Sequence, residues 1–205
     1  MSLIFYYAPR STATITDLVL EELEVSCERI KVDLKKGETR SPEYLRLNPN
    51  GKVPLLVHDG TPIWESVAIT MYLGELFGVE KDLYPAPGPK RGAAMKWIAW
   101  ANVTLGEAVG RLLRNTADWV PAEQRNAKAA EVAQSDLDNC LHILDKDLVH
   151  KHFLTGTYTL ADTHLNSLVD WLRFLKRDLS SYSHMNAWSQ RCAARPAYGR
   201  VMSRR

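Results

Sequence analysis

The chain has 205 residues and a mass of 23.2 kDa, enough for one large domain or two small ones with a substantial hydrophobic core. Hydrophobic residues make up 45% and charged residues 24%, ordinary values that exclude disordered, collagen-like and coiled-coil chains. The formal net charge is only +2, so the charge total favours neither nucleic-acid binding nor attachment to a membrane surface.

The first third of the sequence alternates between strand and helix patterns. A short apolar run at 3–7 predicts a buried strand, and helical spacing of apolar residues predicts a helix over 13–23. Alternation of polar and apolar residues at 29–34 predicts a second strand, parallel to the first. Ser41 followed by Pro42 predicts the start of a short helix that ends at Leu47.

The alternation continues through a hairpin. We predict strands at 53–57 and 61–64, joined by the two-residue turn Asp59-Gly60. Glu65-Ser66 then begins a helix with one apolar face. The order βαβαββα predicts a small α/β domain over residues 1–82.

The rest of the chain has a helical pattern. Three prolines and a glycine within 83–89 break both helix and strand, which predicts an interdomain linker at 83–90. Beyond it, amphipathic segments at 95–113, 122–150 and 160–176 predict an all-α domain over 91–205. Thr159 and Asp162 have the spacing of a capping box before the third segment, which we interpret as a folding device.

The number and spacing of the cysteines indicate a reducing cellular compartment. Cys27, Cys140 and Cys192 form no close pair and leave an odd count. This argues against a disulfide framework and against a zinc cluster, and it fits a reducing environment. The N-terminal apolar run is too short for a signal peptide, and no stretch approaches about 18 uncharged apolar residues. We therefore expect a cytoplasmic protein with no metal and no membrane association.

Pro54 stands near the start of a predicted strand, where its missing N–H cannot join the strand ladder. The local sequence favours a plain edge strand. The alternative is a cis Val53-Pro54 bond, a minority geometry that would turn the Val53 amide and carbonyl outward. These groups could then pair with an extended peptide.

Two predicted helix starts carry hydroxyl groups. Ser66 could simply cap its helix, or the free amides there could bind a carboxylate while Glu65 binds an ammonium, as an α-amino acid would require. Ser11 and Thr12 at the first helix could likewise be caps, or one could donate to a bound thiolate and lower its pKa. Tyr6 is a further donor on the same strand end.

These motifs taken together resemble the cytosolic glutathione S-transferase family, over residues 3 to about 200. The motifs are Tyr6-Tyr7-Ala8-Pro9, Asn48-Pro49-Asn50-Gly51-Lys52-Val53-Pro54-Leu55-Leu56, Glu65-Ser66 and Gly156-Thr157-Tyr158-Thr159-Leu160-Ala161-Asp162. The resemblance implies a thioredoxin-like domain that binds glutathione, a helical domain that supplies a hydrophobic substrate pocket, and a homodimer.

The resemblance also assigns residues to glutathione. It implies that the Val53-Pro54 bond is cis and that the Val53 backbone pairs with the cysteinyl part of glutathione. Lys52 belongs to the same motif. Glu65 and Ser66 are implied to hold the γ-glutamyl head group, which agrees with the amino-acid complementarity expected above.

The sequence departs from its relatives at the catalytic position. Its N-terminal spacing resembles the bacterial beta class, which has a Cys three residues after the Pro, where this chain has Thr12. Gly106 stands near the place of the beta-class histidine. We therefore expect no mixed disulfide with the protein, and a hydroxyl donor to the glutathione thiolate: Ser11 first, Thr12 second and Tyr6 third.

The electrophile pocket is predicted on the first long helix. Trp100, Thr104 and Arg111 share one helical face of mixed character, which suits a cleft wall; the alternative is that Trp100 packs in the core. The predicted function is a glutathione transferase that conjugates hydrophobic electrophiles. The alternative is a protein of the same fold that binds ligand or a partner without turnover.

Overall fold

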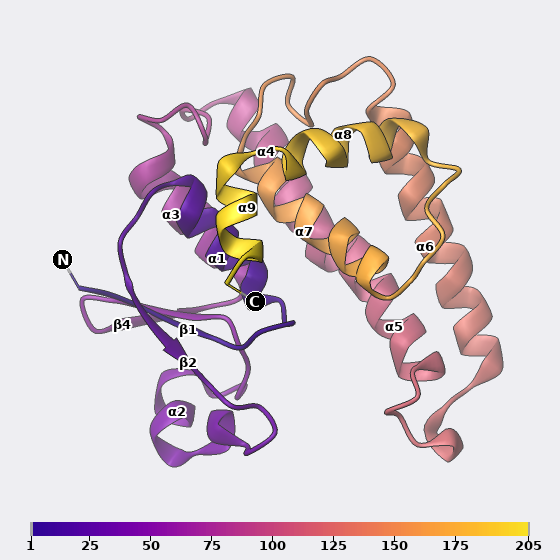
Figure 1. The fold of residues 1–205 in the computed structure, drawn as a ribbon, viewed down its shortest axis with the longest axis horizontal. Coiled ribbons are helices and arrows are strands. Elements are labelled where there is room, and N and C mark those ends of the chain that lie inside the picture. Colours follow the sequence, from indigo (N-terminus) through magenta and orange to yellow (C-terminus); the bar gives the residue numbers. More distant parts are fainter. Residues whose placement is uncertain (1, 205) are drawn as a thin grey trace.

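The computed structural model describes residues 2–204 and contains a four-stranded mixed sheet followed in the chain by an all-helical domain (Figure 1). The strands are β1 (Leu3–Tyr7), β2 (Glu28–Lys31), β3 (Leu55–His58) and β4 (Thr61–Trp64). They lie in the order β2-β1-β3-β4, with β1 parallel to β2 and antiparallel to β3. The predicted fold class is confirmed.

The strand ends follow local hydrogen-bonding chemistry. Strand β2 ends at Lys31 although the alternation predicts a strand to 34, because the Asp33 carboxylate accepts the Lys35 and Lys36 amides and turns the chain. The predicted hairpin is present: β3 and β4 are antiparallel. Asp59 and Gly60 have φ of 46° and 83°, the positive values that a tight hairpin turn requires.

The helices of the first domain enclose the sheet. They are α1 (Ala13–Glu22), η1 (Glu38–Arg40), α2 (Pro42–Leu47), α3 (Ser66–Leu73) and the π-helical turn η2 (Gly74–Gly78). Helices α1 and α3 cover one face, where Phe5 is fully buried, and α2 covers the other, where Tyr6 packs on Tyr44 (Figure 1). Ser41 caps α2 as predicted, accepting the Tyr44 amide at 3.2 Å.

All the named elements in the described part of the second domain are helices. Its elements are α4 (Pro89–Trp100), η3 (Ala101–Gly106), α5 (Glu107–Thr116), η4 (Ala122–Gln124), α6 (Ala127–Asp147), α7 (Leu160–Phe174), α8 (Ser183–Ala193) and α9 (Pro196–Met202). The predicted first helix begins earlier, at Pro89, and contains the π-helical segment η3. The predicted second helix begins later, because the Asn126 side chain accepts the Ala129 amide and caps α6.

Helix α7 is the central element between the two domains, and it contacts α1 and α4. The predicted capping box begins it: Asp162 accepts the Thr159 amide at 2.9 Å and also the Trp188 indole N–H at 2.8 Å. Helix α9 packs on α1. The buried Glu22 carboxylate of α1 pairs with Arg195 next to α9 at 2.7 Å, so the C-terminal segment is joined to the first domain. Within residues 2–204 no helix is both long and apolar enough to cross a bilayer.

Candidate active site

A polar cavity of about 290 Å³ lies where β3 and α3 begin. It brings together Thr12 with the residues expected to bind glutathione. The lining residues are Thr12, Asn48, Asn50, Lys52, Val53, Pro54, Glu65, Ser66 and Asn102. Asn102 comes from η3 of the helical domain and was not among the residues expected to bind glutathione.

The loop before β3 is held by a network of side chains. The Val53-Pro54 bond is cis. The Lys52 carbonyl accepts two hydrogen bonds of 2.7 Å, one from the Tyr44 hydroxyl and one from the Asn48 amide. Burial raises the pKa of Tyr44 to about 12, so this hydroxyl stays a donor at neutral pH. These two bonds therefore hold the loop that carries Val53 against α2 and its C-cap residue.

The structure explains why position 51 in the same loop is a glycine. Its φ is +60°, and a Cβ there would lie 2.6 Å from the Arg40 guanidinium and 2.9 Å from the Thr39 carbonyl oxygen. Any other residue would be strained and would collide with main chain. The Asn-Pro-Asn-Gly motif thus turns the chain tightly enough to bring Lys52 and Val53 to the cavity.

Helix α3 begins at Glu65-Ser66, as the sequence predicts. Glu65 occupies the N-cap position with φ of 72°, a strained value for this residue type, and its exposed carboxylate lines the cavity. Of the two alternatives left open for Ser66, the side-chain cap is absent, because Ser66 is the first helical residue and not the N-cap. The Ser66 Oγ instead accepts the Asn102 side-chain amide at 2.8 Å. The first-turn amides of α3 therefore remain available to an anion.

The two hydroxyls at α1 have different surroundings. The Ser11 Oγ donates to the Ala8 carbonyl at 2.7 Å and accepts the Ala13 amide at 3.2 Å. The Thr12 Oγ1 donates to the Val53 carbonyl at 3.2 Å and is exposed to the cavity. Tyr6 packs between the sheet and α2 and lines neither cavity described here.

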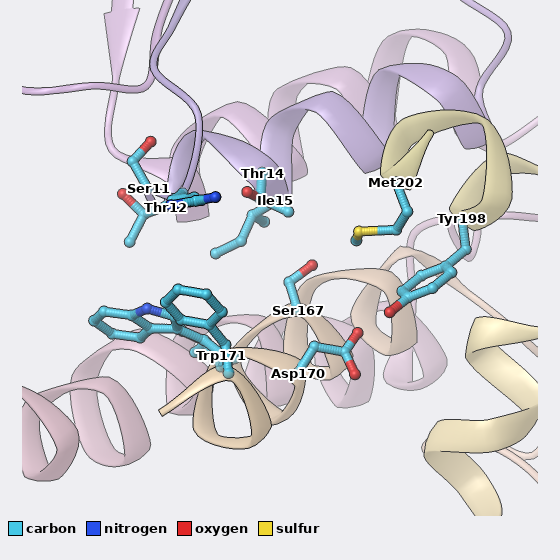
Figure 2. A pocket seen from close by; sticks show the side chains of 12 residues that line it. Ser11, Thr12, Thr14, Ile15, Ser167, Asp170, Trp171, Tyr198 and Met202 are labelled. Atoms are coloured by element: carbon cyan, nitrogen blue, oxygen red, sulfur yellow. The ribbon is translucent and has the colours of Figure 1, made fainter. Parts of the chain in front are cut away.

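A second cavity, of about 320 Å³, lies between α1, α7 and α9. Figure 2 shows Thr12 and Trp171 toward one end and Tyr198 and Met202 toward the other. The lining residues are Arg10, Ser11, Thr12, Thr14, Ile15, Ser167, Leu168, Asp170, Trp171, Phe174, Tyr198 and Met202. Most of its wall is apolar, and Thr12 belongs to both cavities.

The residues expected to form the electrophile pocket lie elsewhere. Trp100 packs edge-on against Trp97, with ring centroids 5.2 Å apart, and Thr104 is exposed. Arg111 pairs with Glu107 at 2.8 Å and with Asp136 at 2.5 Å. None of Trp100, Thr104 and Arg111 lines either cavity. The α-helical spacing used to group them crosses the π-helical segment η3, which changes the helical period.

The protein's own thiols are not placed for catalysis. Burial raises the pKa of Cys27, Cys140 and Cys192 above the ordinary value, so each thiol is held in its protonated form. None of the three lines either cavity. Across residues 2–204, no cluster of three or more His, Cys, Asp or Glu could hold a metal ion.

Comparison with known proteins agrees with this architecture. The chain matches the family model of the glutathione S-transferase N-terminal domain over residues 1–75 and that of the C-terminal domain over residues 113–196. The chain belongs to the glutathione S-transferase family. Glutathione transferase activity is supported by relatives named for it.

Three relatives show how far this glutathione S-transferase resembles known members. It is 33% identical to the disulfide-bond oxidoreductase YfcG of Escherichia coli K12, covering 96% of this chain and 93% of the relative. It is 30% identical to the glutathione S-transferase GstB of the same strain, covering 90% and 89%. The crystal structure of the glutathione transferase URE2P8 from Phanerochaete chrysosporium with oxidised glutathione superposes with a TM-score of 0.88 at 26% identity, covering 99% of this chain and 94% of that one.

Proposed function

We propose that this glutathione S-transferase binds glutathione in the polar cavity and joins it, through its thiolate sulfur, to a hydrophobic electrophile in the apolar cavity. The observation that carries the proposal is that Thr12 lines both cavities. A reaction between two bound molecules needs their reacting atoms at one place, and Thr12 stands where such atoms would meet.

The polar cavity complements the chemistry of glutathione. The Val53 backbone lies beside the cis bond, where it can pair with the cysteinyl backbone of an extended peptide. Glu65 offers a carboxylate to the ammonium of the γ-glutamyl group, and the amides that begin α3 suit its carboxylate. Lys52 supplies a cation at the rim for the other end of the tripeptide.

Thr12 is the hydroxyl that we assign to the glutathione sulfur. Its Oγ1 lies 3.2 Å from the Val53 carbonyl, so it is next to the backbone that would hold the cysteinyl residue. The single proton of Ser11 is already donated to the Ala8 carbonyl, and Tyr6 packs against Tyr44 of α2 on the other face of the sheet from α1. A hydroxyl donor to a thiolate contributes about 1.5–3 kcal/mol, which lowers the thiol pKa by one to two units.

The apolar cavity is the proposed site of the electrophile. Ile15, Leu168 and Trp171 offer it apolar contact area from two domains, and Met202 of α9 closes the far end. Trp100, Thr104 and Arg111 are not included, because no cavity wall described here contains them. The reaction forms a carbon–sulfur bond to the thiolate, and the leaving group departs with the electron pair.

The test compares Thr12→Val, Thr12→Ser and Ser11→Ala in an assay with glutathione and an activated aryl halide. At a pH below the thiol pKa, Thr12→Val is expected to lower kcat/KM roughly 10- to 100-fold, whereas Thr12→Ser keeps most activity. Ultraviolet absorbance of the bound thiolate gives its pKa independently. Unchanged activity and thiol pKa in Thr12→Val would refute the assignment. Glutathione binding without turnover in the parent protein would favour the non-catalytic alternative.

A second candidate function is disulfide reduction by glutathione. The relative YfcG is named a disulfide-bond oxidoreductase, and the structure of URE2P8 contains oxidised glutathione. Since no Cys lines either cavity, the exchange would run between small molecules: one glutathione thiolate attacks the substrate disulfide and releases a thiol, and a second glutathione attacks the mixed disulfide. The products are two substrate thiols and oxidised glutathione. An assay with a small dialkyl disulfide distinguishes it from conjugation.

We also propose a cytoplasmic homodimer. Glutathione remains reduced in that compartment, and the three unpaired cysteines fit it. Trp64, Met95 and Val103 leave 39%, 38% and 73% of their surface exposed on β4, α4 and η3, and a second copy would cover such apolar groups.

A further inference from the structure

A chain of hydrogen bonds runs from the helical domain into the polar cavity. His164 of α7 is fully buried; its Nδ1 lies 2.9 Å from the Thr70 Oγ1 and its Nε2 lies 2.9 Å from the Asn102 Oδ1. The Asn102 side-chain amide then donates to the Ser66 Oγ at 2.8 Å. The chain therefore links α7, η3 and α3, and it ends at a residue that lines the cavity.

The protonation of His164 sets the direction of every bond in this chain. Burial lowers its pKa to about 3, so the imidazole is neutral at pH 7 and carries one N–H. An amide oxygen only accepts, so the proton is on Nε2, which donates to Asn102. The Nδ1 atom then accepts the Thr70 hydroxyl proton.

The reversed chain is less favourable because of Thr70. With the His164 proton on Nδ1, the Thr70 hydroxyl would have to accept, and its own proton would need another acceptor. Thr70 is fully buried, and within residues 2–204 its hydroxyl has only His164 as a hydrogen-bond partner. Leaving a buried donor unpaired costs about 1–3 kcal/mol. In the first direction the unpaired proton is that of Ser66, which faces the cavity and can meet water or ligand.

We propose that Asn102 and His164 are positioning residues that orient the Ser66 hydroxyl proton into the cavity, where it donates to the carboxylate of the ligand's amino-acid head group. The inference rests on the proposed binding of glutathione there. Asn102 donates to one lone pair of the Ser66 Oγ, which leaves the Ser66 proton free to be donated to a ligand oxygen. A second domain thereby contributes to head-group selection although His164 itself lines neither cavity.

The decisive variant is Asn102→Asp. A carboxylate at this position still accepts from the His164 Nε2, but it also accepts from Ser66, so the Ser66 proton turns away from the cavity. The substitution also adds a negative charge next to the proposed position of the ligand carboxylate. Calorimetry should show glutathione binding at least about tenfold weaker, with kcat at saturating glutathione nearly unchanged. The parent should also bind glutathione more tightly than the analogue whose glutamyl α-carboxylate is an amide, and Asn102→Asp should lose that preference.

The matched control is Asn166→Ala. Asn166 is buried on the same helix as His164, but it bonds to Asp170 and Ser189 and lines neither the polar nor the apolar cavity. This variant should bind glutathione as the parent does. Equal affinity of the parent and Asn102→Asp for glutathione would overturn the inference while leaving the proposed function intact, whereas absence of glutathione binding in the parent would overturn both.

The histidine tautomer gives a test that needs no ligand. Nitrogen NMR of the whole protein labelled at histidine should show His164 as the neutral Nε2–H tautomer at pH 7, with its signal assigned by its loss in His164→Gln. An Nδ1–H tautomer would reverse the chain of hydrogen bonds and overturn the inference.

Discussion

The Thr12 hydroxyl donates to the Val53 carbonyl at 3.2 Å, although the two residues stand 41 positions apart in the chain. This bond joins the start of α1 to the loop with the cis peptide, and both groups face the polar cavity. A bound cysteinyl backbone would compete for the Val53 carbonyl and release the Thr12 proton toward the neighbouring sulfur. In the free protein, the Thr12 hydroxyl therefore already lies next to the position proposed for the glutathione sulfur.

Ser11→Ala should affect stability more than catalysis. The Ser11 Oγ bonds both the Ala8 carbonyl and the Ala13 amide at the start of α1, so its removal should lower the free energy of unfolding by about 1 kcal/mol. Urea unfolding measures the loss, and turnover should stay within about twofold of the parent. A large fall in turnover with unchanged stability would instead point to Ser11 as the thiolate donor.

Glu65→Gln should weaken glutathione binding by about tenfold or more, because the ligand ammonium would lose its charged partner. Glu65 is exposed at the cavity and makes no side-chain cap, so the variant should fold normally. Calorimetric titration with glutathione gives the dissociation constant. Glu43→Gln is the control, since Glu43 is an exposed carboxylate on α2 that lines neither cavity. An unchanged constant for Glu65→Gln would place the head group elsewhere.

Glu22→Gln should destabilise the protein. The Glu22 carboxylate has only 5% of its side chain exposed and receives two hydrogen bonds, of 2.7 and 2.8 Å, from the half-buried Arg195. Removing its charge leaves Arg195 without its ionic partner at the junction of the two domains, at a cost of about 2–4 kcal/mol. Thermal or urea unfolding should show the loss. The exposed pair of Arg46 and Glu43 provides the comparison, and Glu43→Gln should change stability by less than about 0.5 kcal/mol.

His164 should make the protein less stable in mild acid. Its folded-state pKa is lowered by burial from 6.5 to about 3, so below pH 6.5 the unfolded chain takes up a proton that the folded chain refuses. The free energy of unfolding should therefore fall by up to about 1.4 kcal/mol per pH unit as the pH drops through this window. His164→Gln should lack this part of the slope between pH 6.5 and pH 4 and match the parent's slope above pH 7. Parallel curves for the two proteins throughout would contradict the prediction.

Val103→Asp should dissociate the proposed dimer. Val103 exposes 73% of its surface on η3, and a carboxylate buried between two copies would lack a partner. Sedimentation at micromolar concentration should give two chain masses for the parent and one for the variant. Val132→Asp is the control, since Val132 is also exposed but lies on α6. One chain mass for the parent would refute the dimer.

Much of the fold follows from signals that act within a few residues. The Asp59-Gly60 turn, the Ser41 cap and the Thr159–Asp162 capping box all appear where the sequence predicts them, because each depends on hydrogen bonds between near neighbours. The resemblance to a family added what local patterns could not, including the expectation of a cis bond before Pro54.

The sequence by itself determined the two-domain fold class, the absence of a Cys at the first helix and the polar motifs that line one cavity. Only the tertiary structure decided that Thr12 lies between two cavities, that Ser66 bonds Asn102 instead of capping α3, and that α9 supplies a wall of the apolar cavity. It also showed that Trp100 and Arg111 line neither cavity, and that a π-helical segment interrupts the α-helical spacing by which they were grouped. The physical reason is range: caps and turns are set by adjacent residues, whereas a cavity is bounded by elements whose packing no local pattern describes.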